Sequence, residues 1–268
     1  AKGSTYSSYY IELVTPDGDK NEYTTAVSCQ NYVNRVVKLT FSDGNAIVKT
    51  ANTQNGVSGM VDAVGGTIGS CRVASNVNIL DISSTNGGDI ALYKNIYLKR
   101  IDGIKLNAED IIYFTKNENG EINNIILKNI TGDIYEYGLI TKVDNRAKTY
   151  TFDINGNPYS TSGSYTGISA GAPAKFVFKG SSLDSMTSIS AVKGAVTNIT
   201  STKVITASSA YTLSDNVVIY TRKALDTAFT ILPKDELLNN IDSYNISAYY
   251  DKTDNSGGRV RVIIAVEK

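Results

Sequence analysis

A pattern near the middle of the chain returns at its end. Residues 110–127 read DIIYFTKNENGEINNIIL and residues 245–266 read NISAYYDKTDNSGGRVRVIIAV, so in both an apolar and aromatic run enters a polar turn and leaves through β-branched residues. The turns hold Asn119-Gly120 and Gly257-Gly258, which tolerate the positive φ that a reversal between twisted strands requires. Each stretch predicts a β-hairpin that closes a unit, and the recurrence indicates two such units.

Four further blocks recur in the same order. The pairs are YYIELV (9–14) with YEYGLITKV (135–143), VKLTF (37–41) with AKFVF (174–178), VSGMV (57–61) with VKGAV (192–196), and NVNIL (76–80) with NVVIY (216–220). The closing hairpins align Tyr113-Phe114 with Tyr249-Tyr250. These separations are far longer than the roughly 20 to 50 residues of a solenoid unit, so they predict duplicated domains.

The predicted fold class is therefore all-β, with two tandem duplicated β-sandwich or barrel-like domains over residues 1–130 and 131–268. Minor helical turns are expected within residues 104–110 and at 233–240, where PKDELLNN places a proline and two acids at a helix start.

Charge and composition narrow the function. Lys and Arg together number 26 and so do Asp and Glu, and no run of five like charges occurs, so neither nucleic acid nor an anionic membrane is indicated as a partner. The apolar runs are far shorter than the roughly 20 residues that span a bilayer, so no membrane insertion is predicted. The chain has no His, the usual general base and transition-metal ligand near neutral pH.

Two acidic patterns have simpler explanations than chemistry. Residues 17–21, DGDKN, imitate the start of a calcium loop, but Glu22 stands where the loop needs Gly and Ser28 where it needs a bidentate Glu, so a turn is predicted. The adjacent acids Glu109-Asp110 and Asp235-Glu236 fit capped turns rather than the paired carboxylates of a glycosidase. No catalytic, cofactor or metal site is predicted, and we do not expect an enzyme.

Cys29 and Cys71 are the only two thiols, and both lie in the first half. Two ligands cannot close a zinc site, and without His neither thiol has an imidazole to activate it. Either a disulfide or two buried free thiols fits the sequence.

Residues 110–137, DIIYFTKNENGEINNIILKNITGDIYEY, and residues 248–265, AYYDKTDNSGGRVRVIIA, resemble the β-repeat region of cell-surface proteins of anaerobic Firmicutes that carry S-layer homology domains. The resemblance implies export, a structural role at the bacterial cell surface, and attachment through modules that bind cell-wall polysaccharide. Those modules have no counterpart in this sequence, so wall binding is assigned to no residue here. The first residue, Ala1, fits either a mature secreted form or a trimmed piece.

The leading hypothesis is a secreted, self-assembling subunit of an S-layer lattice or extracellular filament, whose partner is itself. The alternative is a carbohydrate- or cell-wall-binding β module with an exposed aromatic platform, for which tyrosines such as Tyr9 and Tyr10 are candidates.

Strand pairing between subunits is predicted to use residues 2–14. Small residues open this segment, and the six residues that follow, Tyr9, Tyr10, Ile11, Glu12, Leu13 and Val14, have strand character and form the candidate donor strand. The other interpretation is that Tyr9–Val14 pairs within its own domain.

Overall fold

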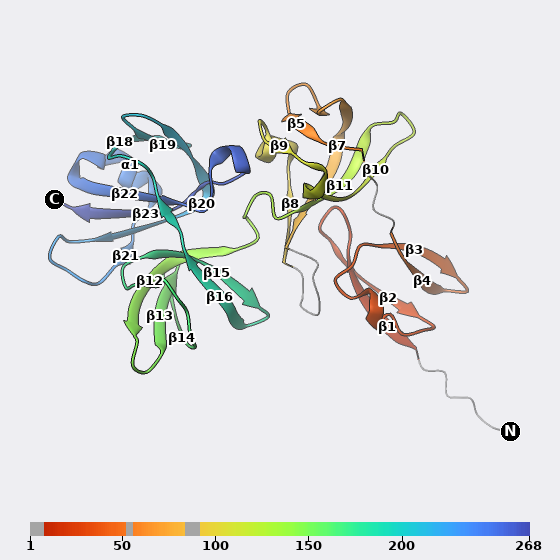
Figure 1. The fold of residues 1–268 in the computed structure, drawn as a ribbon, viewed down its shortest axis with the longest axis horizontal. Coiled ribbons are helices and arrows are strands. Elements are labelled where there is room, and N and C mark those ends of the chain that lie inside the picture. Colours follow the sequence, from red (N-terminus) through yellow and green to blue (C-terminus); the bar gives the residue numbers. More distant parts are fainter. Residues whose placement is uncertain (1–7, 52–55, 84–91) are drawn as a thin grey trace. The chain divides into compact units, whose positions relative to one another are not determined.

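The structure is a computed structural model that describes residues 8–51, 56–83 and 92–268. The chain divides into two compact units, residues 1–134 and 135–268, a few residues after the boundary expected from the sequence. Both units are built mainly of strands (Figure 1), so the predicted all-β class with barrel-like sheets is confirmed.

Unit 1 contains eleven strands in its described residues: β1 (Tyr9–Val14), β2 (Lys20–Thr25), β3 (Val37–Ser42), β4 (Asn45–Thr50), β5 (Gly59–Asp62), β6 (Thr67–Ile68), β7 (Cys71–Ile82), β8 (Tyr93–Ile96), β9 (Lys105–Leu106), β10 (Ile111–Lys116) and β11 (Ile122–Lys128). Short 3-10 turns lie at Gln30–Tyr32, Leu98–Ile101 and Ala108–Asp110, the last within the predicted helical turn.

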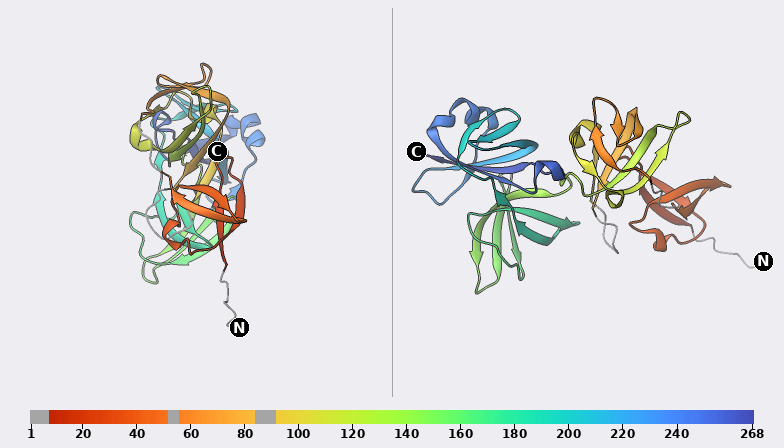
Figure 2. Two further views of the ribbon diagram at one scale, coloured as in Figure 1. Left: turned by 90° about the vertical axis from the view of Figure 1, so that its right-hand side faces the viewer. Right: turned by 45° about the horizontal axis from the view of Figure 1, so that its top comes forward.

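The main sheet of unit 1 has the order β10-β11-β7-β6-β5-β9, and β8 pairs with β7. Its core consists of fully buried aliphatic residues from alternate strand positions, among them Ile68, Ile79, Ile122, Ile125 and Leu127. The hairpins β1–β2 and β3–β4 form two separate two-stranded sheets that lie beside one another at the margin of this main sheet (Figures 1 and 2).

Unit 2 contains β12 (Glu136–Asp144), β13 (Thr149–Ile154), β14 (Asn157–Ser162), β15 (Pro173–Lys179), β16 (Ser182–Ser188), β17 (Ser190–Ala191), β18 (Val196–Ile199), β19 (Lys203–Thr206), β20 (Ala210–Arg222), β21 (Thr230–Ile231), β22 (Tyr244–Tyr250) and β23 (Val260–Glu267). The helix α1 spans Lys234–Asn239, as predicted, and 3-10 turns lie at Ile241–Ser243 and Asp254–Ser256. One sheet has the order β14-β13-β12-β15-β16, and the other β17-β22-β23-β20-β19-β18 with β21 on β20.

The two larger sheets share one connectivity. In each, the second strand of the closing hairpin pairs in parallel with a long earlier strand, β11 with β7 and β23 with β20. Ile125 lies opposite Ile79 in unit 1, and Ile263 lies opposite Ile219 in unit 2, with a register irregularity at the same place in both ladders. The predicted match of NVNIL with NVVIY is therefore confirmed, and the larger sheets of the two units share the order of five of their strands.

Two predicted block alignments are wrong by a few residues. Ile125 faces Phe114 across the hairpin, while its counterpart Ile263 faces Ala248, so Phe114 corresponds to Ala248 and not to Tyr250. The sequence match paired aromatic rings, whereas the fold aligns the positions that point into the core.

The second error concerns VSGMV and VKGAV. Val61 pairs with Ile68 in unit 1 and Ile199 pairs with Val204 in unit 2, and all four residues are buried. Val61 therefore corresponds to Ile199 rather than to Val196, because the inward-facing position of the strand decides the register.

Candidate assembly surface

The predicted donor strand, β1, pairs with β2 of its own unit along its whole length, from Tyr9 opposite Thr25 to Val14 opposite Lys20. Lys20 Nζ lies 2.9 Å from Glu12 Oε1, and this exposed pair raises the pKa of Lys20. Residues 2–7 of the predicted donor segment lie outside the described residues.

The loop between β1 and β2 is a turn, as predicted. Asp17 accepts hydrogen bonds from the Thr15 hydroxyl and, at 3.2 Å, from the Asp19 amide, and these bonds lower its pKa. Asn95 of β8 donates to the Pro16 carbonyl at 3.2 Å, which fastens the turn to the main sheet of the unit. The described residues contain no cluster of three or more acids and thiols that could hold a metal ion.

The second edge of β1 differs from that of its counterpart in unit 2. There, β12 pairs with β13 on one side and with β15 on the other, where Gly138 lies opposite Ala174 and Leu139 opposite Pro173. In the described part of unit 1, β1 pairs with β2 and with no other strand. Among the described residues, the backbone N–H and C=O groups along this edge of β1 thus have no partner strand, whereas the same edge of β12 pairs with β15.

The strand equivalent to β15 is present in unit 1. Hairpin β3–β4 reverses through Asp43-Gly44 between the paired residues Ser42 and Asn45, and β15–β16 reverses through two residues between Lys179 and Ser182. Both central residues of the first turn have positive φ, as a two-residue hairpin loop requires. The turns confirm the match of VKLTF with AKFVF, so β3 is the counterpart of β15, and its outer edge is likewise unpaired in the described chain.

Hairpin β3–β4 packs against β2 rather than beside β1. The rings of Tyr23 on β2 and Phe41 on β3 have centroids 5.5 Å apart, and the Ala51 amide donates to the Val36 carbonyl at 3.1 Å at the base of the hairpin. A groove opens between β1 and this hairpin as a result.

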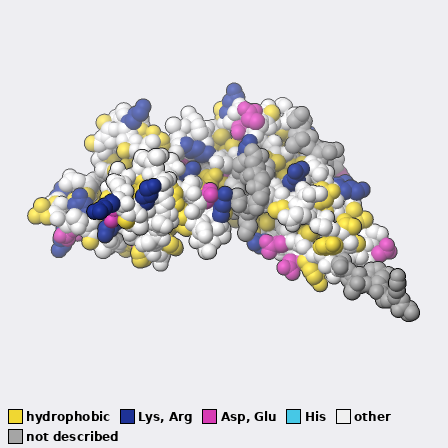
Figure 3. Space-filling view, turned by 60° about the horizontal axis from the view of Figure 1, so that its bottom comes forward, with side chains coloured by type: hydrophobic (Ala, Val, Ile, Leu, Met, Phe, Trp, Pro, Cys, Tyr) yellow, Lys and Arg dark blue, Asp and Glu magenta, His cyan; other side chains and the backbone are white. Residues whose placement is uncertain are grey.

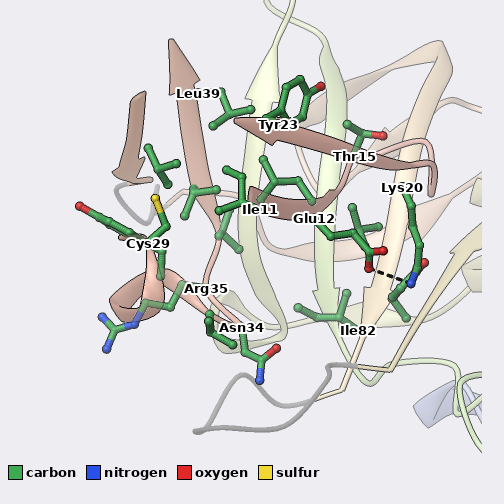
Figure 4. Close-up of a pocket in the computed structure, with 18 of the residues that line it drawn as sticks. Ile11, Glu12, Thr15, Lys20, Tyr23, Cys29, Asn34, Arg35, Leu39 and Ile82 are labelled. Atoms are coloured by element: carbon green, nitrogen blue, oxygen red, sulfur yellow. Dashed lines mark hydrogen bonds and ion pairs between the residues drawn. The ribbon is translucent and has the colours of Figure 1, made fainter. Parts of the chain in front are cut away.

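The groove has a volume of about 670 Å³ and takes in all of β1, Tyr9–Val14. Its other walls come from residues 28–37, from Leu39 and Val48 of the β3–β4 hairpin, and from Leu80, Ile82 and Ile126 of the main sheet. Among its described lining residues, only Glu12, Lys20 and Arg35 are charged. Figure 4 shows Glu12 meeting Lys20 at the rim and Arg35 extending away from the groove, and the rest of the lining is uncharged and mainly apolar.

The equivalent place in unit 2 is filled. Tyr137, Leu139, Val218, Tyr220, Val262 and Ile264 form a buried cluster between β12 and the sheet of β20 and β23. Tyr220, which occupies the position of Leu80, is 1% exposed, and its hydroxyl lies 2.9 Å from both the carbonyl and the side-chain oxygen of Asp153. Burial, with this hydrogen bond second, raises the pKa of Tyr220 far above its ordinary value.

Exposed hydrophobic side chains gather around the groove. Tyr10 is 74% exposed and Phe41 is 61% exposed, and Tyr9, Val33 and Ile47 are also exposed on the same two hairpins and the segment that joins them. In Figure 3, hydrophobic side chains gather on this part of unit 1, toward the lower right of the view. Such a concentration on a strand-edge surface is typical of an interaction site.

The two cysteines are free thiols in the structure, so the disulfide alternative is not what the fold contains. Cys29 lines the groove, and its Sγ lies 3.6 Å from the Val27 carbonyl oxygen and 3.8 Å from Thr25 Oγ1. Cys71 begins β7 and lies 4.0 Å from the Gly56 carbonyl oxygen.

The six candidate strand residues therefore come together along the groove, and Cys29 joins them although no local pattern placed it there. The sequence did not predict the groove. The groove exists because β1 and β3 do not pair in the described part of unit 1, whereas their counterparts pair in unit 2. Within the described residues, no helix combines the length and apolar character needed to cross a membrane.

Comparison with protein-family models, with curated proteins and with solved structures found no match.

Proposed function

We propose that the chain is a self-assembling structural subunit of an extracellular bacterial surface layer or filament, and that subunits join by β-strand pairing. The observation that supports this proposal is the edge of β1, which is unpaired among the described residues and lies in a mainly apolar groove, at a place where unit 2 has a paired strand and a filled core.

An unpaired edge of this kind favours association. Natural proteins protect sheet edges with lysines, prolines, bulges or covering loops, because an open edge offers a row of hydrogen-bonding groups to any extended chain. β1 instead carries exposed Tyr9 and Tyr10, and its one charged residue, Glu12, is paired with Lys20. The apolar groove adds a hydrophobic contribution of about 25 cal/mol per Å² of apolar surface that a partner covers.

The test is a charge placed on the edge. Tyr10→Lys introduces a cation on an exposed residue of β1, so the fold is retained while pairing at this edge is disfavoured. Tyr97→Lys is the matched control, because Tyr97 is 83% exposed in the same unit and does not line the groove. Negative-stain microscopy and size-exclusion chromatography with light scattering measure the outcome.

We expect sheets or fibres from the natural chain and from Tyr97→Lys, and smaller particles from Tyr10→Lys. Dispersed monomers from all three proteins would contradict self-assembly. If those monomers also bound cell-wall polysaccharide saturably, a wall-binding module would take its place.

A further inference from the structure

We propose that the partner at the β1 groove is β3 of a second copy, whose free edge pairs antiparallel with β1. The inference rests on the proposed function, since it names the surfaces that join in self-assembly. β1 and β3 are the counterparts of β12 and β15, which pair with each other inside unit 2. Unit 1 therefore has two strand edges whose counterparts pair with each other in unit 2. Both edges are unpaired in the described chain.

Unit 2 also supplies the register. On β3, Val37 corresponds to Ala174, because the two hairpins reverse at equivalent residues. On β1, Ile11 lies opposite Tyr23 of β2, as Ile140 lies opposite Phe152 of β13, so Tyr9 corresponds to Gly138. Since Gly138 pairs with Ala174 and Leu139 with Pro173, this register places Tyr9 opposite Val37 and Tyr10 opposite Val36 of the neighbouring copy, so the ladder covers the start of each strand.

A second copy fits better than the same chain because β3 is already held in place. The contact of Phe41 with Tyr23 holds hairpin β3–β4 against β2, and in the described chain β3 does not pair with β1. A neighbouring molecule can meet the free edge of β3 without breaking the contact of Phe41 with Tyr23.

The side chains at the two edges are compatible. Val37 and Leu39 of β3 are half-buried and apolar, and Lys38 between them is the only charged residue of that strand. The register of β12 with β15 places Lys38 opposite Ser8, so Lys38 faces no cation. Glu12 of β1 remains paired with Lys20. No like charges face each other across the proposed ladder, which would otherwise be destabilising.

The geometry also decides the kind of assembly. The β1 edge and the β3 edge are different surfaces, so the contact is heterologous and each copy keeps one edge of each kind free. Head-to-tail contacts of this type propagate into a filament or lattice unless a rotation closes them into a ring.

Single-cysteine chains test the pairing between copies directly. In a background of Cys29→Ser and Cys71→Ser, one chain carries Tyr9→Cys and a second, size-tagged chain carries Val37→Cys. Because each chain has one thiol, a disulfide of mixed size can form only between molecules. The matched control replaces the second chain with Lys49→Cys, which lies opposite Lys38 on β4, away from the free edge of β3. Circular dichroism verifies that every variant is folded.

Mild oxidation is expected to give several-fold more mixed-size disulfide with Val37→Cys than with Lys49→Cys. Equal yields from chains that still form sheets or fibres would overturn this inference and leave the proposed function standing. A chain that carries both Tyr9→Cys and Val37→Cys and forms only an internal disulfide would also overturn it, because β3 would then close onto β1 within one molecule. Chains that neither cross-link nor assemble would overturn both proposals.

Discussion

Tyr220 illustrates how one side chain distinguishes the two units. Its ring fills the space between β12 and the larger sheet of unit 2, and its hydroxyl bonds to Asp153 on β13. Leu80 occupies the same position in unit 1, has no hydroxyl to reach β2, and lines the groove. The residue at this one position, Tyr220 in unit 2 and Leu80 in unit 1, therefore contributes to whether the space is filled or forms the groove.

Tyr220→Phe is expected to destabilise unit 2 by about 1 kcal/mol, because it removes one hydrogen-bond donor to the half-buried Asp153, whose Oδ1 still accepts from the Gly156 amide. The pH dependence follows from the raised pKa of Tyr220. The folded state favours the protonated phenol, so the stabilisation is complete below pH 10 and is lost as pH rises above 10, the ordinary pKa of tyrosine. Urea unfolding at pH 7 and pH 11 measures both effects, and an equal loss in the variant and the natural chain at pH 11 would contradict this explanation.

A buried ion pair gives a second prediction for single residues. Arg261 Nη2 lies 2.9 Å from Asp251 Oδ2, the two side chains are 3% and 7% exposed, and the guanidinium stacks over the ring of Tyr137 at 4.7 Å. Asp251→Asn removes the carboxylate charge that faces a buried guanidinium, so we expect a loss of about 3 kcal/mol or more.

The control for this pair is Asp184→Asn, which disrupts the exposed pair with Lys179 and is expected to cost less than about 1 kcal/mol. Similar unfolding midpoints for the two variants would show that the buried pair contributes no more than a surface pair.

At the scale of elements, local patterns predicted the hairpins and helical turns well. Residues 110–127 contain β10 and β11, and the proline, acids and leucines at 233–240 form α1. Ser75 and Asn76 interrupt the apolar pattern of the long strand β7, so the sequence alone predicts two short strands there, at 70–73 and 77–82. The strand pairs with β6 at Cys71 and Arg72 and with β11 from Asn78 to Ile82, and a local pattern contains no information on such distant partners.

Pairing between distant strands also explains why the groove was not predicted. Nothing in YYIELV or VKLTF shows that these strands stay apart, since YEYGLITKV and AKFVF have the same character and their strands pair. In unit 1 the hairpin β3–β4 packs against β2 through Phe41 and Tyr23, and the pattern of neither strand by itself shows such packing.

Gly138 gives a test of the closed sheet in unit 2. A Cβ at this position would lie 2.0 Å from the Asp153 carbonyl oxygen, a main-chain atom, so β12 and β13 would have to separate. Gly138→Ala is expected to destabilise unit 2 by about 3 kcal/mol, at the upper end of the usual cost of overpacking. Gly167→Ala is the control, since nothing lies within 4 Å and only its positive φ of 71° is strained, at about 1 kcal/mol. Equal losses in thermal unfolding would contradict the steric explanation.

At the scale of the whole molecule, each unit has its own sheets and its own hydrophobic core. The buried cluster around Ile79 and Ile125 draws only on residues of unit 1, and the clusters around Ile263, Phe152 and Tyr220 draw only on residues of unit 2. Each unit therefore has the apolar interior that independent folding requires, and the assembly edges proposed for unit 1 can be tested in that unit alone.

The last prediction is that residues 1–134 and 135–268 fold as separate proteins and differ in assembly. The first fragment retains both free edges, β1 and β3, so we expect it to polymerise, whereas the second has β12 paired with β15 and is expected to remain monomeric. Circular dichroism tests folding, and light scattering with microscopy tests assembly at equal concentrations. A monomeric first fragment beside a full chain that polymerises would move the contact away from the groove, and polymers of the second fragment would show that a paired β12 edge does not prevent assembly.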